Sequence, residues 1–146
     1  MGSMVEVVRD RTRRRGLVDD CIRLIEAEVN AKRGLRGMAV KAGYKAINRI
    51  RPGMVAVAMD GLLDEFAEEI DPFWQRCQRD GVQPSVFFSS HRSEIANALL
   101  SVTDKRAQVS ANPTVVNIYN GLRGKAAQHI GEAMPRFSAL VVKHAS

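Results

Sequence analysis

The sequence has few of the residues that build disulfide scaffolds, thiolate metal sites or stacking surfaces. It contains only two cysteines, Cys21 and Cys77, and they lie far apart without paired spacing. Such usage argues against a secreted disulfide scaffold and against a zinc site built from thiolates. Aromatic residues make up only 5% of the chain, which argues against a platform on which single-stranded nucleic acid stacks.

Long apolar runs are also missing. No run approaches the roughly 18 residues that a membrane-spanning helix needs. The segment VEVVRDRTRRRG near the start is too highly charged to hold the apolar core of a signal peptide. We therefore expect a cytoplasmic protein with no transmembrane segment.

The composition that remains is that of an ordinary globular protein. Hydrophobic residues make up 45% of the 146 residues and charged residues 26%, a balance too apolar for a disordered chain. A chain of this length fits one domain with its own core. We expect residues 1–16 to be a tag remnant followed by an Arg-rich N-terminal arm, and residues 17–146 to form a single helical domain.

Apolar residues recur at steps of three and four along almost the whole chain, which is the spacing of amphipathic helices. Proline and glycine interrupt this pattern, because the residue before proline is pushed out of helical geometry. The pattern predicts an all-α, single-domain bundle of six or seven helices with short connections marked by Pro or Gly. The predicted helices span residues 17–34, 36–50, 52–70, 72–81, 85–106, 112–134 and 135–141.

Two of the predicted breaks carry a capping signal. Asp71-Pro72 and Asn112-Pro113 each place a side chain that can cap a helix before a proline at the first helical position. We therefore expect one helix to begin at each of these pairs.

A basic segment without carboxylates, KRGLRGMAVKAGYKAINRIRPG, occupies residues 32–53. The net charge of the chain is +6, but residues 1–51 carry 13 Lys or Arg against 6 Asp or Glu, and residues 52–146 carry 9 against 10. The excess positive charge therefore belongs to the N-terminal third. The anion-binding candidates are Arg33, Arg36, Lys41, Lys45, Arg49 and Arg51.

The predicted helix after the basic segment is acidic. Between Pro52 and Gln75 there are six carboxylates and no Lys or Arg. A tight reversal at Pro52-Gly53 would pack the two helices antiparallel, with the basic flank of one along the acidic flank of the other. Because exposed ion pairs contribute only about 0–1 kcal/mol each, this pairing would set orientation more than stability.

Three interpretations of the basic segment remain open. It is a solvated, partly self-neutralised face, or an anion-binding surface, or an interface of a homo-oligomer in which the flanks of two molecules meet. If the segment is an anion-binding surface, the natural partner is nucleic acid, bound weakly and non-specifically, since Lys and Arg contacts to phosphate supply most non-specific affinity. An acidic second helix, however, does not suit a helix-turn-helix.

Two histidines have a carboxylate three residues further on, His91 with Glu94 and His129 with Glu132. On two neighbouring helices these pairs would project toward similar sides and could hold a metal ion. The order is the reverse of the Glu-x-x-His spacing of ferritin-like sites. Metal binding is therefore the alternative interpretation, and we expect no other cofactor. No motif for nucleophilic catalysis or phosphate binding is present.

Four segments together resemble an uncharacterised family of bacterial helical proteins: KRGLRGMAVKAGYKAINRIRPG, LLDEF, ALLSVTDKRA and AAQHIGEAMP. The resemblance covers about residues 17–142. It implies a single all-helical domain and no activity, so it transfers no site residue. We interpret the chain as a non-enzymatic helical protein that self-associates or binds an anionic partner through the helix at about 36–51.

Overall fold

The structure is a computed structural model that describes residues 2–50 and 53–146, without the side chains of Arg36, Ile47 and Ile50. This part of the chain is all-helical and contains no strand. The all-α class predicted from the sequence is confirmed, and the eight helices exceed the six or seven predicted. The helices are α1 (Met4–Arg9), α2 (Arg11–Ala31), α3 (Gly34–Ile50), α4 (Met54–Asp80), α5 (Pro84–Ser90), α6 (Arg92–Val109), α7 (Pro113–Glu132) and α8 (Met134–Ala145).

The first helix, α1, lies where the sequence predicted an arm outside the domain. Met4, Val7 and Val8 are buried in the core. The hydroxyl of Ser3 caps the helix by accepting the backbone N–H of Glu6 at 3.1 Å. Residues 4–9 therefore belong to the bundle, whereas the sequence predicted an arm outside it. Three buried apolar side chains are enough to anchor this short, charged helix.

The predicted break at Asp71-Pro72 is wrong, because α4 continues through Pro72. Proline costs about 3 kcal/mol or more inside a helix, and burial of an apolar stripe on both sides of it outweighs that cost. Asp71 does cap a helix, but that helix is α1: its carboxylate accepts the backbone N–H groups of Met4 and Val5 at 2.6 and 3.0 Å. The stripe consists of Leu63, Ala67, Ile70, Trp74 and Cys77.

The single helix predicted over 85–106 is divided at His91, which ends α5 and precedes α6. Its backbone, at φ −106° and ψ 18°, departs from helical geometry. The ring of His91 stacks on that of Phe87 with centroids 4.2 Å apart, and its Nδ1 lies 2.9 Å from the Phe87 carbonyl oxygen. The Phe87 carbonyl oxygen also accepts the backbone N–H of His91 at 3.0 Å, so the ring of His91 adds a second contact at the end of α5.

The cap predicted at Asn112-Pro113 is confirmed. The side chain of Asn112 accepts the backbone N–H groups of Thr114 and Val115 at 3.0 and 3.2 Å, and Pro113 is the first residue of α7. The sequence could predict this cap because the capping side chain and the N–H groups that it accepts lie within four residues of each other.

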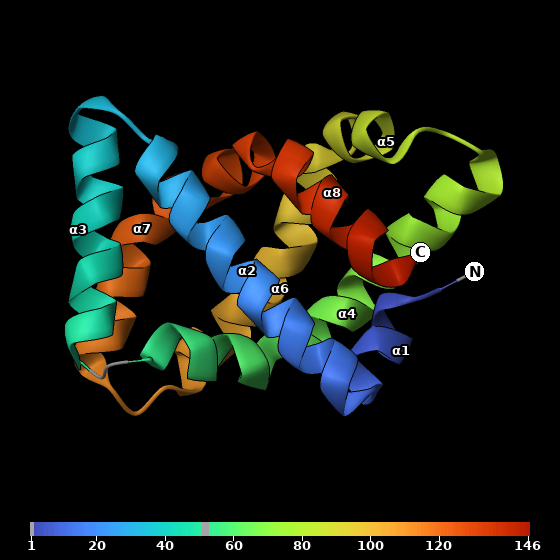
Figure 1. Ribbon diagram of the computed structural model, residues 1–146. Coiled ribbons are helices and arrows are strands. Elements are labelled where there is room, and N and C mark those ends of the chain that lie inside the picture. Colours follow the sequence, from blue (N-terminus) through green and yellow to red (C-terminus); the bar gives the residue numbers. More distant parts are fainter. Residues whose placement is uncertain (1, 51–52) are drawn as a thin grey trace.

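The bundle has a well-packed half and a thinner half. In Figure 1, α2 crosses the front of the molecule with α6 behind it, while α3 stands at one side in front of α7. The buried core comes from α1, α2, α4, α5, α6 and α8, and no described side chain of α3 or α7 belongs to it. A Cβ atom at Gly43 would lie 3.2 Å from Leu122 of α7, so this glycine lets α3 and α7 approach closely.

Candidate functional site

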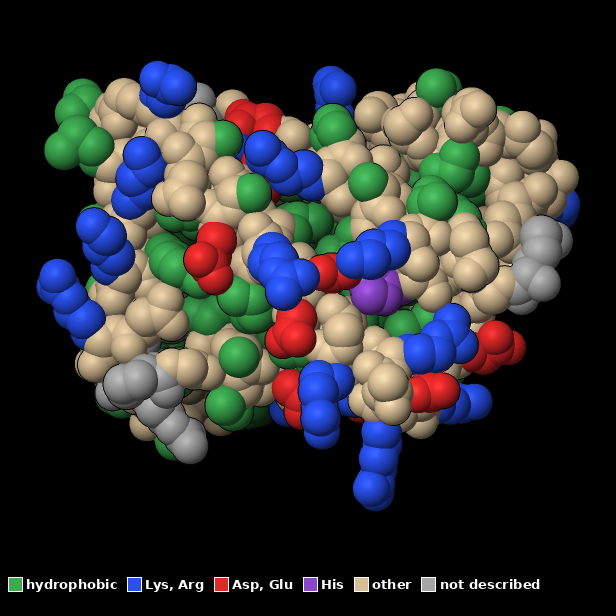
Figure 2. Space-filling model, in the orientation of Figure 1, with side chains coloured by type: hydrophobic (Ala, Val, Ile, Leu, Met, Phe, Trp, Pro, Cys, Tyr) green, Lys and Arg blue, Asp and Glu red, His purple; other side chains and the backbone are tan. Residues whose placement is uncertain are grey.

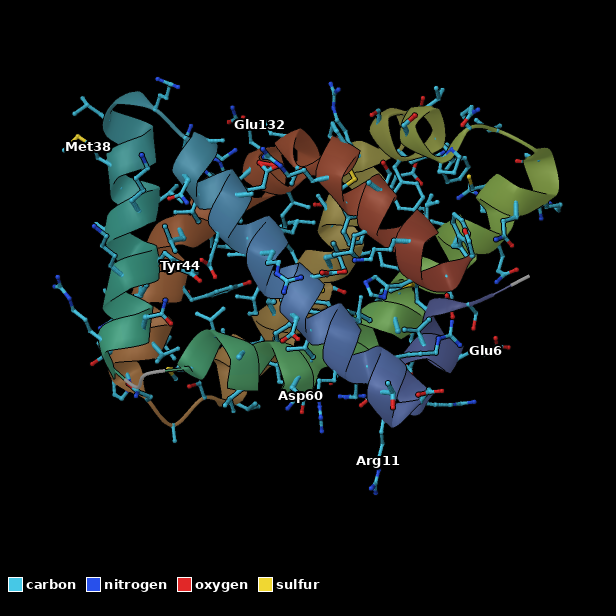
Figure 3. The ribbon with its side chains drawn as sticks, viewed as in Figure 1. Glu6, Arg11, Met38, Tyr44, Asp60 and Glu132 are labelled. Carbon is cyan, nitrogen blue, oxygen red and sulfur yellow. The ribbon has the colours of Figure 1, made fainter. Side chains whose placement is uncertain are left out.

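A cleft of about 460 Å³ lies between α3 and the C-terminal half of α2. We call it the basic cleft. Figure 2 shows Lys and Arg side chains along the edge formed by α3, and hydrophobic side chains in the hollow beside it. In Figure 3, Tyr44 lies on the inner side of α3, whereas Met38 points away from the molecule. The lining residues are Glu26, Val29, Asn30, Lys41, Tyr44, Lys45, Asn48 and Arg49.

The cleft carries an uncompensated positive charge. Lys41, Lys45 and Arg49 form no ion pair or hydrogen bond with any residue that the structure describes. Among the described lining residues, Glu26 is the only carboxylate, and it is exposed. Three cations therefore face one anion, and a cleft lined mainly by one sign of charge concentrates its field on an incoming ligand.

The structure brings together three of the six predicted anion-binding residues. Lys41, Lys45 and Arg49 line the basic cleft, as their spacing on one stripe predicted. Arg33 is exposed before α3, where its backbone carbonyl oxygen accepts the N–H of Gly37 at 3.2 Å, and its side chain does not line the cleft. The side chain of Arg36 and the whole of Arg51 lie outside the described residues.

The predicted pairing of the basic helix with the acidic helix is wrong for the described residues. Arg14 of α2 binds Asp60 and Asp64 of α4 at 2.8 and 3.0 Å. Arg106 of α6 binds Glu65 at 2.8 Å. The hydrogen bonds to Asp60 and then Asp64 raise the pKa of Arg14. Figure 1 shows the reason, since α2 and α6 run across α4 whereas α3 meets it only at its N-terminal end.

The four residues of the alternative metal site have no metal-binding arrangement. His91 Nε2 lies 3.4 Å from Nη2 of Arg76, and Glu94 is exposed in the first turn of α6. Glu132 is paired with Lys32, whose hydrogen bond lowers the pKa of that carboxyl. His129 is half-buried on α7. Among the described residues, no group of three or more His, Cys, Asp or Glu side chains could hold a metal ion.

Both cysteines are held as neutral thiols. Burial raises the pKa of Cys21 to about 12, and burial also raises the pKa of Cys77. The thiol of Cys77 donates a hydrogen bond to the carbonyl oxygen of Val82 at 3.2 Å. Because the thiolate is the reactive form, neither residue is poised as a nucleophile.

A polar cluster that the sequence analysis missed joins α6 to α7. Asp104 accepts hydrogen bonds from Arg123 at 2.8 and 3.1 Å and from the hydroxyl of Tyr119 at 2.5 Å. The bond from Arg123, followed by that from Tyr119, lowers the pKa of Asp104. The oxygen atoms of Thr103 and Tyr119 lie 2.7 Å apart. This cluster positions α7 although α7 buries no side chain.

Almost the whole chain matches one protein family. The model described as a family of unknown function, DUF6918, matches residues 4–145. The chain belongs to DUF6918. The DUF6918 match includes α1 and the start of α2, where the resemblance noted in the sequence began only at residue 17. No curated protein and no solved structure matches the chain.

In the part of this DUF6918 chain that the structure describes, none of the helices combines the length and the apolar character needed to cross a bilayer.

Proposed function

We propose that this protein is a non-enzymatic binding protein that engages an anionic partner through the basic cleft. The observation that supports the proposal is the grouping of Lys41, Lys45 and Arg49 in one cleft without an ion-pair partner among the described residues. In contrast, Asp60, Asp64 and Glu65 of α4 are already engaged within the molecule. The positive charge of α3 is therefore available to an outside anion.

The polar lining of the cleft also suits an anion. Asn30, Tyr44 and Asn48 place amide and hydroxyl groups beside the three cations, and such groups can donate hydrogen bonds to anionic oxygen atoms. We place the protein in the cytoplasm, because two separate, free cysteines fit a reducing compartment.

Self-association through α3 is the second candidate. Leu35 and Met38 are 86% and 68% exposed near the start of this helix, and contact with a second copy could cover them. Repulsion between like charges makes this candidate the weaker one. Two copies that meet along α3 would bring Lys45 and Arg49 near the same cations of the partner. Sedimentation velocity over a hundredfold range of protein concentration tests it, and a monomer at every concentration contradicts it.

Salt-dependent binding of a short DNA duplex, used as a polyanion probe, tests the primary proposal. In the variant Lys41→Ser/Lys45→Ser/Arg49→Ser, we expect the slope of log affinity against log salt to fall by about 2.7, since each phosphate contact contributes about 0.9. The matched control Arg9→Ser/Arg11→Ser/Arg15→Ser removes the same charge from exposed positions at the opposite end of the molecule.

The two variants give opposite expectations. The control retains the slope of the wild type if the basic cleft is the binding surface. An unchanged slope for the cleft variant, or no binding of the duplex at low salt, contradicts binding of a polyanion at this surface. A larger loss in the control than in the cleft variant would assign binding to the start of α2 instead.

A further inference from the structure

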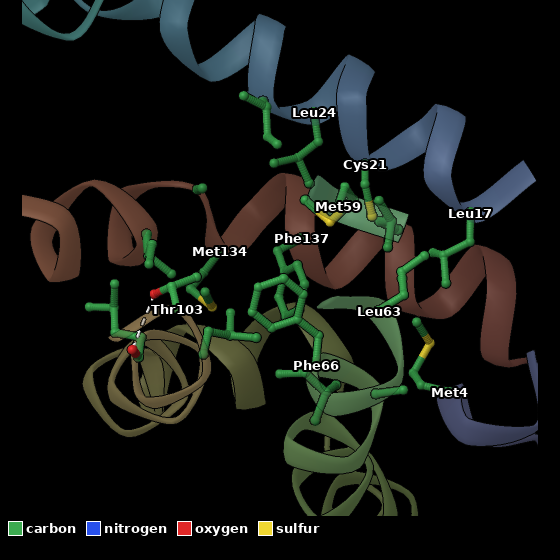
Figure 4. A pocket seen from close by; sticks show the side chains of 18 residues that line it. Met4, Leu17, Cys21, Leu24, Met59, Leu63, Phe66, Thr103, Met134 and Phe137 are labelled. Carbon is green, nitrogen blue, oxygen red and sulfur yellow. Dashed lines mark hydrogen bonds between the residues drawn. The ribbon is translucent and has the colours of Figure 1, made fainter. Parts of the chain in front are cut away.

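A second hollow, which we call the apolar cavity, lies inside the bundle and has a volume of about 260 Å³. It is larger than the roughly 150 Å³ cavity that holds benzene in a well-studied engineered protein. Six helices and Ala133, which lies between α7 and α8, supply its 18 lining residues, and Figure 4 shows these side chains around the hollow. The cavity therefore depends on how these six helices pack together.

The walls of the cavity offer an apolar ligand no competing polar group. Among the described lining residues, Thr103 has the only hydroxyl, and there is no charged side chain. The hydroxyl of Thr103 donates to the carbonyl oxygen of Leu100 at 3.1 Å and lies 2.7 Å from that of Tyr119, so it is already satisfied. A hollow of this kind favours a hydrocarbon over water, which needs two to four polar partners.

Cys21 is one of the residues that line this apolar cavity. Protein atoms surround its thiol, and this burial raises the pKa of the thiol to about 12. Cys21 is half-buried. Figure 4 shows its sulfur atom directed into the hollow beside Met59.

The residues that line the cavity differ in exposure. Met4 and Leu17, at one end of the view in Figure 4, are 5% and 0% exposed. Thr103 at the other end is half-buried, as are Ile25 and Ile130. Met59, Phe66 and Phe137 are half-buried as well. Ile130 belongs to α7, and Ile25 belongs to the C-terminal half of α2, which runs toward α3 in Figure 1.

The apolar cavity and the basic cleft adjoin each other along α2. Ile25 lines the cavity and Val29 lines the cleft. Residues four apart lie on one face of a helix, about 6 Å apart along its axis. A ligand with an apolar chain and a negative head group could therefore occupy both hollows at once.

We propose that the protein binds a single-chain carboxylate, with its alkyl chain in the apolar cavity and its carboxylate beside Lys41, Lys45 and Arg49. This inference rests on the proposed function, because the head group is the anion that the basic cleft binds. The cavity supplies the affinity that grows with chain length, and the cations select the charged end. A single chain is required because the cavity has the volume for only one.

Displacement of the fluorescent probe N-phenyl-1-naphthylamine by dodecanoate, decanoate and octanoate measures binding. Each additional buried methylene strengthens binding by about fourfold, so dodecanoate binds most tightly. Dodecanol, which has the same chain without the charge, binds about fivefold less tightly than dodecanoate. Dodecanoate also raises the thermal midpoint of the protein, because it binds only the folded state.

Two variants separate the chain from the head group. Cys21→Phe fills the cavity and weakens both dodecanoate and dodecanol by at least about tenfold, while Val109→Phe adds the same ring at a position that is 78% exposed and changes neither. Lys41→Ser/Lys45→Ser/Arg49→Ser weakens dodecanoate alone. If Cys21→Phe does not fold by circular dichroism, Ala67→Leu fills the same cavity from α4.

Three results overturn the inference. The first is the absence of dodecanoate binding by the wild type. The second is a folded Cys21→Phe or Ala67→Leu variant that binds both ligands as the wild type does. The third is an unchanged preference for dodecanoate over dodecanol in the variant without the three cations. Failure of the proposed function is seen separately, in the salt dependence of the DNA duplex.

Discussion

The carboxylate of Asp71 accepts the backbone N–H of Met4 at 2.6 Å, across 67 positions of the sequence. A second oxygen of the same carboxylate accepts the N–H of Val5 at 3.0 Å. One side chain in the middle of α4 therefore satisfies two of the donors that the start of α1 leaves without partners inside the helix.

Replacing Asp71 with Ala should release α1 from α4. We expect the free energy of unfolding to fall by about 1 kcal/mol, the usual cost of a lost helix cap, and the amide protons of residues 4–9 to exchange faster. Urea denaturation and hydrogen exchange measure the two effects. Glu68→Ala is the matched control, because Glu68 is an exposed carboxylate one turn earlier in α4 without a hydrogen bond to a described residue. An equal loss in both variants would contradict the capping role.

Replacing Arg14 with Ala should loosen the contact of α2 with α4. Its guanidinium binds Asp60 and Asp64 and donates to the carbonyl oxygen of Val8 at 3.1 Å. Because both carboxylates are more than half exposed, we expect a loss of only about 1–2 kcal/mol. The loss should shrink in 1 M salt, where exposed charges are screened. Arg15→Ala, at the neighbouring exposed position, should cost little, and urea titrations at both salt concentrations compare the two.

The stability of the protein should depend on pH through Asp20. The hydrogen bond from Lys143, aided by that from His144, lowers the pKa of Asp20 to about 2 from its ordinary 3.8. A carboxyl with a depressed pKa stabilises the fold above its ordinary pKa, and this contribution is lost as the pH falls through the lower value. At pH 7, Asp20→Asn should cost about 1–2 kcal/mol, reduced by screening because Lys143 is 66% exposed.

Thermal denaturation of the wild type and Asp20→Asn between pH 7 and pH 2 checks the sign. The difference between them should be constant down to about pH 4, decrease from pH 4 to pH 2, and disappear below pH 2. A difference that grows toward low pH would contradict the assigned role of Asp20.

Replacing Glu26 with Gln should strengthen anion binding at the basic cleft. The change removes the only carboxylate among the described lining residues and keeps the shape of the side chain. At an exposed site we expect an affinity gain of about two- to fivefold for dodecanoate and none for dodecanol. Glu6→Gln, a change of the same kind at an exposed position of α1, is the control in the same displacement assay.

Local patterns in the sequence predicted part of the fold and of the site. The all-α class followed from apolar spacing, the start of α7 from the cap at Asn112, and the common stripe of Lys41, Lys45 and Arg49 from their separation by four residues. Each of these depends on residues a few positions apart, for which helical geometry alone gives the answer.

Features that depend on distant residues could not be predicted in this way. Pro72 remains inside α4 because side chains on both sides of it are buried by other helices. Arg14 rather than Lys41 meets the acidic face of α4, a choice set by which helices cross it. The apolar cavity is enclosed by six helices, and no spacing within one helix reports a space left between several.

The helices of the bundle do not contribute equally to the core. The core residues come from α1, α2, α4, α5, α6 and α8, whereas α7 buries no side chain and the described side chains of α3 add none to the core. Segments with few buried apolar contacts open at low cost in free energy. The three cations thus lie on α3, whose separation from the core would cost less free energy than that of its neighbours, and such opening would let a ligand enter.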